Sequence, residues 1–351
     1  MSNNLLKLLY IGNFLTKHGM SPNQGAAIVG FLKKRGWDIT YTSAMKNKVF
    51  RLISMIYDTF KFSISKHRKL SIIDLFSGSS YFYAIFLISL IHSILGINYI
   101  LVCRGGNLPA RIKNRSKIIS FIFKNATAIV CPSSYLQNIL VDKLNIKKTV
   151  IIPNGIDRKI YKRCDLKNVG NIVFLRAFNK IYDPITLIKA FSIVLETVPF
   201  ANLTLIGYDM KDGTYEKSLE CIKSLGIKKN VVMRPPIEKS DIPLLADDYA
   251  TFVNCSIIDN TPVSTIEAMA MGMCIVGTNV GGIPHLIKDN YNSLIVPPQR
   301  ENELADSILE IIKNNELAKR IGKQARKSSK RYDWKNVIEH WELQINNAMS
   351  K

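Results

Sequence analysis

The six cysteines of this 351-residue chain show no spacing that would bind a metal or form a redox motif. There is no CxxC pair and no cysteine–histidine ligand pattern, and most of the cysteines stand in or beside apolar, strand-like runs. Thiols placed in this way are typical of the reduced core of a cytosolic protein. We therefore expect neither disulfides nor a structural metal.

We also expect no signal peptide, because the run after the first four residues resembles a strand and not the long apolar core of a leader. The most apolar segment, 81–103, is long enough to cross a bilayer, and a membrane span is one interpretation of it. Because polar residues interrupt it and Gly96 breaks it, we expect instead a helix over 81–95, a turn, and a strand over 99–103. The expected location is the cytoplasm, with peripheral binding at the inner face of the membrane as an extension of that hypothesis.

Acidic residues are few, since 27 Asp and Glu stand against 48 Lys and Arg and leave a net charge of +21. The basic residues are densest at 33–35, 46–51, 61–69 and 111–124. An anionic membrane surface, a lipid acceptor linked through pyrophosphate, or a nucleic acid could each attract this charge, and a solvated lysine-rich face would have the same composition. No zinc-finger, RNP-like or Gly-x-x-Gly motif accompanies the charge, so we expect no nucleic-acid partner.

Apolar residues make up 47% of the chain, and its length fits two domains that each bury a core. The chain opens with a strand at 5–11, a helix at 25–36 and a second strand at 37–42, and similar alternation continues to the end. This order predicts an α/β fold with parallel sheets. The loop that begins at Gly12 then faces the ligand-binding edge of the first sheet.

Residues 46–69 combine apolar positions at helical spacing with lysine and arginine. We expect a helix that packs on the sheet and turns its basic residues to solvent. The alternative is a helix that lies on a membrane surface.

The stretch 251–284 has the pattern of a strand, a loop, a helix, a second strand and a Gly-Gly-Ile-Pro loop. The first strand is expected at 251–254. Thr261 can cap the helix and Pro262 suits its first turn, because proline lacks an N–H that would be unpaired there. Gly272 ends the helix. A helix N-terminus at the carboxyl end of a parallel sheet favours phosphate, so the stretch predicts an anion site.

Two carboxylates, Asp259 and Glu267, accompany this predicted anion site. Carboxylates are poor phosphate ligands but good acceptors for sugar hydroxyls. The combination predicts a ligand with a phosphate part and a hydroxyl-rich part, such as a nucleotide sugar. The alternative is a capped helix with a solvated Glu267.

The stretch resembles the donor-site motif of retaining glycosyltransferases with the GT-B fold (glycosyltransferase group 1, family 4-like). That motif has an acidic residue, seven further residues, a Glu on a helix, a small-residue run, a strand and GGIP. Asp259 stands at the first position, where the family usually has Glu, and Glu267 at the second. The resemblance implies two Rossmann-like domains facing a cleft, with the first acid on the transferred sugar and the second on the nucleotide ribose.

The run VIIPNGID at 150–157 resembles the interdomain hinge of that family. The resemblance implies an acceptor-side domain at 1–153 and a nucleotide-sugar domain at 154–334. It also implies that a final helix at 335–349 packs back on the first domain.

In the resembled family an Arg, and a Lys five residues later, hold the diphosphate of the sugar donor. Arg176 matches the first, but residue 181 is Ile and Lys180 comes one position early. By resemblance the catalytic residues are then Asp259, Glu267, Arg176 and Lys180. The residues expected to bind the donor are Gly207, Arg234, Asn260, Thr261, Pro262, Val263, Ser264 and Gly12.

On the acceptor side, the histidine that the family often places after the fourth strand is absent. Arg104 or its neighbour Gly105 fills that position, and His18 lies in the loop after the first strand. Arg104 could bind an acceptor phosphate or the charge that develops on the leaving group.

The resemblance implies a retaining hexosyltransferase that moves a sugar from a nucleoside diphosphate sugar to a glycan or lipid-linked acceptor in cell-surface polysaccharide synthesis. No Asp-x-Asp motif is present, so we expect no metal and no cofactor beyond the donor substrate. Two alternatives remain open. One is a sugar-nucleotide epimerase on the same fold, and the other is a non-catalytic, basic, membrane-associated scaffold.

Overall fold

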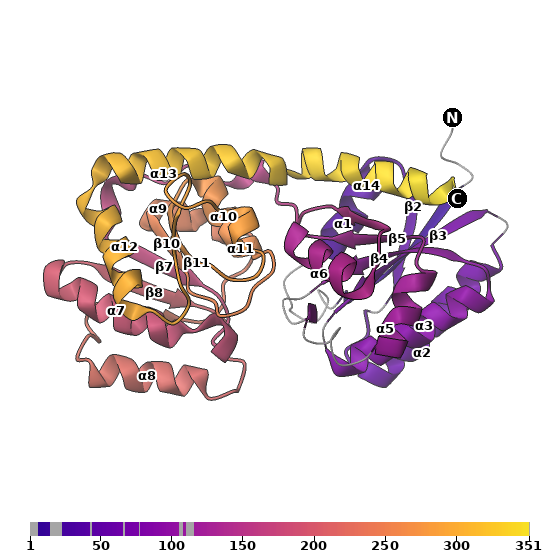
Figure 1. Ribbon diagram of the computed structural model, residues 1–351, viewed down its shortest axis with the longest axis horizontal. Helices are drawn as coiled ribbons and strands as arrows, with labels where there is room; N and C mark the ends of the chain where they lie inside the picture. The colour runs from indigo at the N-terminus through magenta and orange to yellow at the C-terminus, as the bar shows by residue number, and fades with distance from the viewer. Residues whose placement is uncertain are drawn as a thin grey trace. The chain divides into compact units, whose positions relative to one another are not determined.

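The computed structural model describes residues 6–14, 23–42, 44–65, 67–76, 78–104, 108–109 and 116–350. The chain divides into two compact units, which are drawn in Figure 1. Unit 1 comprises the chain up to Gly155 together with the segment from Trp334 onward, and unit 2 is Ile156–Asp333.

Unit 1 is built on six parallel strands in the order β2-β1-β3-β4-β5-β6. These strands are β1 (Leu6–Ile11), β2 (Asp38–Thr42), β3 (Arg68–Leu75), β4 (Asn98–Cys103), β5 (Ala128–Cys131) and β6 (Thr149–Ile151). The four central strands are almost entirely buried, which parallel sheets require because helices cover both of their faces.

Alternate side chains of these strands enter two separate cores. Leu9 and Ile11 pack with α2, α3, α5 and α6 on one face, whereas Leu8 and Tyr10 pack with α1 and α14 on the other. The helices of unit 1 are α1 (Gln24–Lys34), α2 (Lys48–Ser63), α3 (Ser79–Ile94), α5 (Ser116–Asn125), α6 (Ser134–Leu144) and α14 (Trp334–Met349).

The apolar segment 81–103 forms a helix, a turn and a strand, as its sequence predicts. The helix α3 ends at Ile94, Gly96 turns the chain with φ +63°, and β4 begins at Asn98. Within the described part of the chain, every helix is too short or too polar to span a bilayer. All six cysteines are free thiols and five of them are buried, in agreement with a reduced core.

Unit 2 is built on a second sheet of six parallel strands, in the order β12-β11-β10-β7-β8-β9. They are β7 (Asn171–Leu175), β8 (Asn202–Ile206), β9 (Val231–Arg234), β10 (Thr251–Asn254), β11 (Cys274–Thr278) and β12 (Leu294–Val296). The chain order reverses between β7 and β10. Ligands of open α/β sheets bind beyond the carboxyl ends of the strands at such a switch point.

Helices cover both faces of the second sheet. One core joins the sheet to α7, α8 and α12, and the other joins it to α9, α10 and α11. The helices are α7 (Pro184–Thr197), α8 (Thr214–Ser224), α9 (Leu245–Asp248), α10 (Val263–Met271), α11 (Ile283–Leu286), α12 (Glu301–Lys313) and α13 (Asn315–Ser328), and a short 3-10 helix, η5 (Lys180–Tyr182), follows β7.

Candidate functional site

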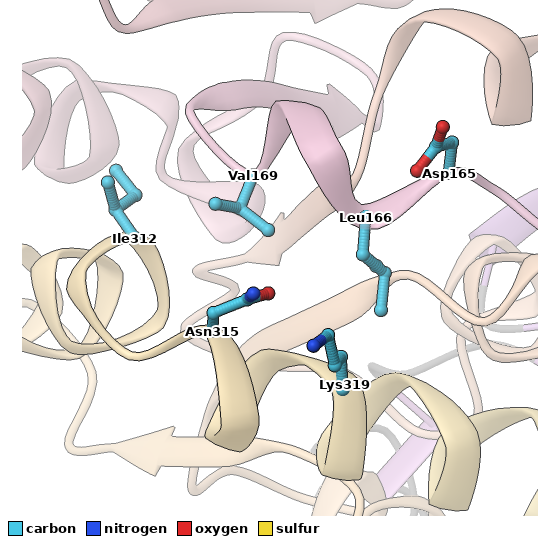
Figure 2. Close-up of a pocket in the computed structure, with 6 residues that line it drawn as sticks. All are labelled: Asp165, Leu166, Val169, Ile312, Asn315 and Lys319. Atoms are coloured by element: carbon cyan, nitrogen blue, oxygen red, sulfur yellow. The ribbon is translucent and has the colours of Figure 1, made fainter.

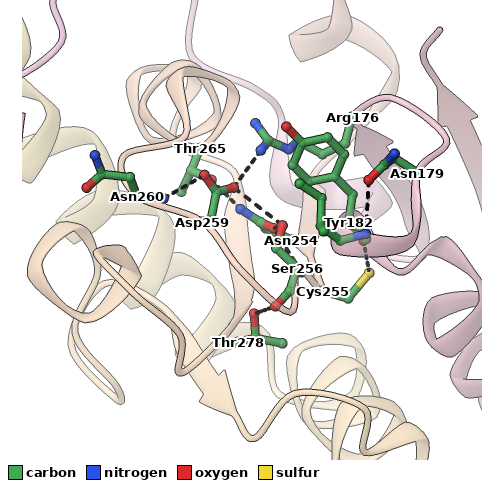
Figure 3. Close-up of polar contacts among 11 residues, drawn as sticks. Arg176, Asn179, Tyr182, Asn254, Cys255, Ser256, Asp259, Asn260, Thr265 and Thr278 are labelled. Carbon is green, nitrogen blue, oxygen red and sulfur yellow. Dashed lines mark hydrogen bonds and ion pairs between the residues drawn. The ribbon is translucent and has the colours of Figure 1, made fainter. Parts of the chain in front are cut away.

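Polar side chains gather at the switch point of unit 2 (Figure 3). Arg176 is the first residue after β7, and the loop that contains Asp259 follows β10. Because β7 and β10 are hydrogen-bonded neighbours, their carboxyl ends bring these residues together although they are 83 positions apart. The order of the strands in the sheet therefore determines where the site lies.

The centre of the cluster is an ion pair. Arg176 Nη2 donates to Asp259 Oδ2 at 2.6 Å, and the two side chains are only 14% and 10% exposed. The guanidinium also lies 3.9 Å from the centre of the Tyr182 ring, a cation–π contact that Figure 3 shows. Arg176 Nε is buried and has no hydrogen-bond partner among the described residues. This donor of the guanidinium is thus left unsatisfied within the described part of unit 2.

The loop that carries Asp259 is held by its own backbone and by the glycine loop after β11. The N–H of Asn260 donates to Asp259 Oδ1 at 2.9 Å. A Cβ at Gly281 would lie 1.9 Å from the carbonyl oxygen of Asp259, and one at Gly282 would lie 1.9 Å from that of Asn260. Gly281 also has a φ of +54°, so glycine is required there for two reasons. The Gly-Gly pair lets the two loops touch.

A buried hydrogen-bond network fixes the base of the same loop. Ser256 Oγ donates to Asn254 Oδ1 at 2.6 Å, and Asn254 Nδ2 donates to Thr265 Oγ1 at 3.2 Å. Thr278 Oγ1 donates to the carbonyl of Ser256 at 2.6 Å. Asn254, Thr265 and Thr278 belong to β10, α10 and β11, and Ser256 lies in the loop after β10. Figure 3 shows these four residues around Asp259. Fully paired buried networks are rigid, so the carboxylate is held in a defined position.

The N-terminus of α10 differs in one detail from the sequence prediction. The helix begins at Val263, and Pro262 in the cap position makes no side-chain cap hydrogen bond. The predicted cap at Thr261 is wrong, because the helix starts one residue later and proline has no side-chain acceptor. The hydroxyl of Ser264 is buried without a hydrogen-bond partner among the described residues. Gly272 ends the helix with φ +73°, as predicted.

Glu267 lies on α10 and is only 3% exposed, which excludes the alternative of a solvated glutamate. Tyr161 Oη donates to Glu267 Oε1 at 2.9 Å, and Lys239 Nζ lies 3.8 Å from the same atom. Burial raises the pKa of Glu267, and Lys239 and Tyr161 oppose that rise. Burial and the neighbouring Glu267 raise the pKa of the Tyr161 hydroxyl. Tyr161 and Lys239 are not among the residues predicted from the sequence, since nothing local to either residue indicates this contact.

Another predicted donor residue, Gly207, lies beside Arg176, and Gly207 in turn contacts Arg234. A Cβ at Gly207 would lie 1.9 Å from the carbonyl oxygen of Arg176, so this glycine permits the ends of β7 and β8 to approach. The N–H of Gly207 donates to the carbonyl of Arg234, whose own side chain is exposed. The N–H of Lys180 donates to Asp212 Oδ2 at 3.0 Å, and its side chain is exposed.

The predicted acceptor-side residues belong to unit 1. Arg104 follows β4 and donates to three partners: Asp74 Oδ1 at 3.0 Å from Nε, Asn154 Oδ1 at 3.1 Å from Nη1, and Tyr10 Oη at 3.3 Å from Nη2. Its guanidinium is therefore engaged within unit 1. A Cβ at Gly12 would lie 2.9 Å from Asp74 Oδ2, so Gly12 packs against this cluster. His18 and Gly105 lie outside the described residues.

A cavity of about 570 Å³ in unit 2 is not part of this site (Figure 2). Leu166 and Val169 line it and precede β7, which places it near the amino-terminal edge of the sheet. Arg176 and Asp259 lie at the opposite, carboxyl-terminal edge. The cavity therefore has no share in the chemistry at the switch point.

The sequence of this chain is similar to those of known glycosyltransferases. The family model for "Glycosyl transferases group 1" matches residues 157–328. An uncharacterized glycosyltransferase of Methanocaldococcus jannaschii is 29% identical over 268 residues, which are 71% of this chain and 68% of that protein. Spore coat protein SA of Bacillus subtilis is 25% identical over 60% of this chain and 63% of its own length. The chain thus spans about two thirds of the length of these relatives.

Solved structures show the same architecture. Sucrose-phosphate synthase from Thermosynechococcus elongatus superposes with a TM-score of 0.80 at 14% identity, covering 98% of this chain and 99% of that one. Anabaena HepE in complex with UDP and glucose superposes with a TM-score of 0.75 at 15% identity, covering 97% and 99%. At these identities the likeness concerns the fold.

Proposed function

Because residues 157–328 belong to the glycosyl transferases group 1 family and the chain has the GT-B fold, we propose that unit 2 binds a nucleoside diphosphate sugar as a glycosyl donor. The sugar passes to a glycan or lipid-linked acceptor with retention of its anomeric configuration, in the synthesis of a cell-surface polysaccharide. The observation that carries the proposal is the meeting of the Arg176–Asp259 pair with the N-terminus of α10 at one switch point.

Four groups can stabilise the diphosphate in this arrangement. The unpaired Nε of Arg176 can donate to a phosphate oxygen, and the first N–H groups of α10 offer an anion site. The hydroxyl of Ser264 lacks a partner among the described residues and stands in the same turn. The exposed side chain of Lys180 can add a second cation. Since charge grows on the diphosphate as the sugar leaves, these contacts raise the rate more than the affinity.

The two carboxylates suit the hydroxyl-rich parts of the donor. We assign Asp259 to the transferred sugar and Glu267 to the nucleotide ribose. A carboxylate that is 3% exposed needs hydrogen-bond donors, and ribose hydroxyls would add to the one that Tyr161 supplies. The absence of an Asp-x-Asp motif supports transfer without a metal, with Arg176 and the helix N-terminus neutralising the diphosphate.

The solved relatives support the donor class. Structures of Anabaena HepE hold UDP-glucose, or UDP and glucose, and one of Staphylococcus aureus TarM holds UDP with alpha-GlcNAc-glycerol. We therefore propose a nucleoside diphosphate as the part of the substrate that unit 2 recognises. The base and the sugar are to be found by screening.

Calorimetric titration with UDP, GDP and ADP, followed by a panel of the matching nucleotide sugars, tests this function. We expect one nucleotide to bind, and Glu267→Ala to reduce turnover by about a hundredfold or more, because a contact to the donor is lost. The matched control Glu310→Ala removes an exposed carboxylate of the same unit and should behave as wild type.

Three outcomes would contradict the proposal. Binding of none of the nucleotides would favour a non-catalytic scaffold. Release of a free epimerised sugar without any acceptor would favour an epimerase. Wild-type turnover of the Glu267→Ala variant would remove the proposed donor contact.

A further inference from the structure

The helix α2 (Lys48–Ser63) of unit 1 turns a row of large apolar side chains to solvent. Six such side chains on the helix and at its end are between 47% and 82% exposed: Val49, Phe50, Ile53, Tyr57, Phe60 and Ile64. Their spacing of one, three, four, three and four residues places them on one face. The residues that α2 buries, Met55, Thr59 and Phe62, lie on the opposite face.

This arrangement inverts the usual pattern of a surface helix, in which the outer face is polar. The helix α13 of unit 2 shows the usual pattern, since it buries Leu317 and Ile321 and exposes Lys319 and Lys323. Contiguous apolar patches of this kind mark binding surfaces. Sequence periodicity alone leaves open which apolar positions of residues 46–69 are buried, and the structure shows that the six above are not.

The charge of the residues around α2 indicates the chemistry of the partner that this apolar row would bind. Residues 44–69 contain seven Lys or Arg and one acidic residue, Asp58. The exposed side chains of Lys46, Lys48 and Lys61 stand at the two ends of the apolar row. Over residues 1–150 the imbalance is 21 basic to 4 acidic residues, all of the latter Asp. A surface that is apolar along its centre and basic at its ends matches an anionic lipid bilayer, in which the phosphates lie directly outside the acyl region.

We propose that the outer face of α2 docks on the surface of an anionic membrane. The helix lies in the plane of the bilayer over a length of about 24 Å, its apolar row enters the boundary between headgroups and acyl chains, and the flanking lysines meet lipid phosphates. The inference rests on the proposed function in one respect only, which is that membrane docking would bring the enzyme to a lipid-linked acceptor. Membrane binding itself requires no sugar transfer.

The test is co-sedimentation of the full chain with vesicles of phosphatidylcholine alone and of phosphatidylcholine with phosphatidylglycerol. We expect binding to the anionic vesicles only, weakened by salt. A variant with Ile53→Ser and Phe60→Ser should bind at least about tenfold more weakly, because two large apolar groups no longer enter the bilayer. Since both side chains are already exposed, the far-UV circular dichroism and the nucleotide affinity should stay unchanged.

Two controls match this variant. Leu343→Ser, on α14, and Phe200→Ser, in unit 2, remove exposed apolar side chains elsewhere (60% and 76% exposed) and should leave vesicle binding intact. A third variant, with Lys46→Gln, Lys48→Gln and Lys61→Gln, should lose the preference for anionic vesicles.

Failure of wild type to bind anionic vesicles, or equal binding by the Ile53→Ser/Phe60→Ser variant, would overturn the proposal. A change of oligomeric state in that variant without vesicle binding by wild type would overturn it in favour of contact between copies of the chain. Arg176→Ala separates the two proposals, because it should bind vesicles as wild type does while losing transfer. A protein that binds vesicles but no nucleotide would refute the proposed function and leave this inference standing.

Discussion

Each unit carries an arginine–aspartate ion pair at the carboxyl edge of its parallel sheet. In unit 1, Arg104 Nε lies 3.0 Å from Asp74 Oδ1, and in unit 2, Arg176 Nη2 lies 2.6 Å from Asp259 Oδ2. The arginine side chains are similarly covered, at 12% and 14% exposure. Ion pairing and burial therefore do not distinguish the two.

The difference lies in the hydrogen-bonding capacity left over. All three nitrogens of Arg104 donate to residues of unit 1, and the unsatisfied atom of this pair is an acceptor, Asp74 Oδ2, which is buried beside Gly12 and Gly25. In unit 2, Arg176 Nε lacks a partner among the described residues, and so does the nearby hydroxyl of Ser264. An arginine whose nitrogens all have partners stabilises the fold of its unit, whereas an arginine with an unsatisfied donor is suited to bind an anionic ligand.

Breaking the pair in unit 1 should have the largest effect on stability. Arg104→Met leaves Asp74, which is 1% exposed, without its counter-charge and should lower the free energy of unfolding by about 3–5 kcal/mol. The three tryptophans, Trp37, Trp334 and Trp341, all belong to unit 1, so their fluorescence reports its denaturant unfolding. Arg68→Met, an exposed arginine of the same unit, is the control. Loss of transfer at unchanged stability would show instead that Arg104 binds the acceptor.

Breaking the pair in unit 2 should act mainly on the reaction. Arg176→Ala removes a donor aimed at the diphosphate and should lower the rate of transfer by about 10²–10³-fold, measured on protein with wild-type circular dichroism. Arg163→Ala, an exposed arginine of unit 2, serves as the matched control. If Arg176→Ala retains the wild-type rate of transfer, the ion pair of unit 2 does not act on the reaction, and the proposed difference between the two ion pairs is wrong.

The two units should also respond to acid in opposite directions, and unit 1 should show the larger response. His92 is fully buried between Ile88 O and Ser71 Oγ, and burial lowers its pKa from 6.5 to about 4. Since the unfolded chain binds the proton more readily, stability is complete above pH 6.5 and falls as the pH drops toward 4, by about 3 kcal/mol. In His92→Gln, the free energy of unfolding measured by tryptophan fluorescence should fall less as the pH drops toward 4. An unchanged fall would mean that other titratable groups cause the loss of stability in acid.

Glu267 should give the smaller and opposite response in unit 2. Burial raises its pKa, so the folded state holds this proton more firmly than the unfolded state does. Its contribution to stability is therefore complete below the ordinary pKa of a glutamate and is lost as the pH rises through the raised value. The stability of Glu267→Gln relative to wild type should increase from pH 4 to pH 8 in urea titrations followed by circular dichroism. A constant difference would mean that Lys239 and Tyr161 fully offset the burial.

The vesicle experiment extends the same comparison to the surfaces of the two units. The exposed apolar row of α2 in unit 1 has no counterpart on α13 of unit 2, whose outer face carries lysines. Truncation of that row should remove membrane binding, whereas changes at the switch point of unit 2 should not.

Several features of the fold follow from local sequence. Continuous apolar runs predict the parallel strands, and Gly96 predicts the turn that divides the segment 81–103. Gly272 ends α10 because a helix commonly closes with a residue at positive φ. The helix α5 was not predicted from the sequence. Ile119, Ile122 and Phe123 have helical spacing, but the segment was interpreted only through its basic charge.

The partners within the site could be decided only by tertiary structure. Arg176 meets Asp259 across 83 positions because β7 and β10 are neighbours, and Tyr161 meets Glu267 across 106. Local periodicity extends over only a few turns of the chain. It is enough to determine helices and strands, and with them the spacing of Asp259 and Glu267. Strand order determines which distant residues share an edge, and packing determines which apolar face of α2 remains outside. Both depend on contacts that no short stretch of sequence contains.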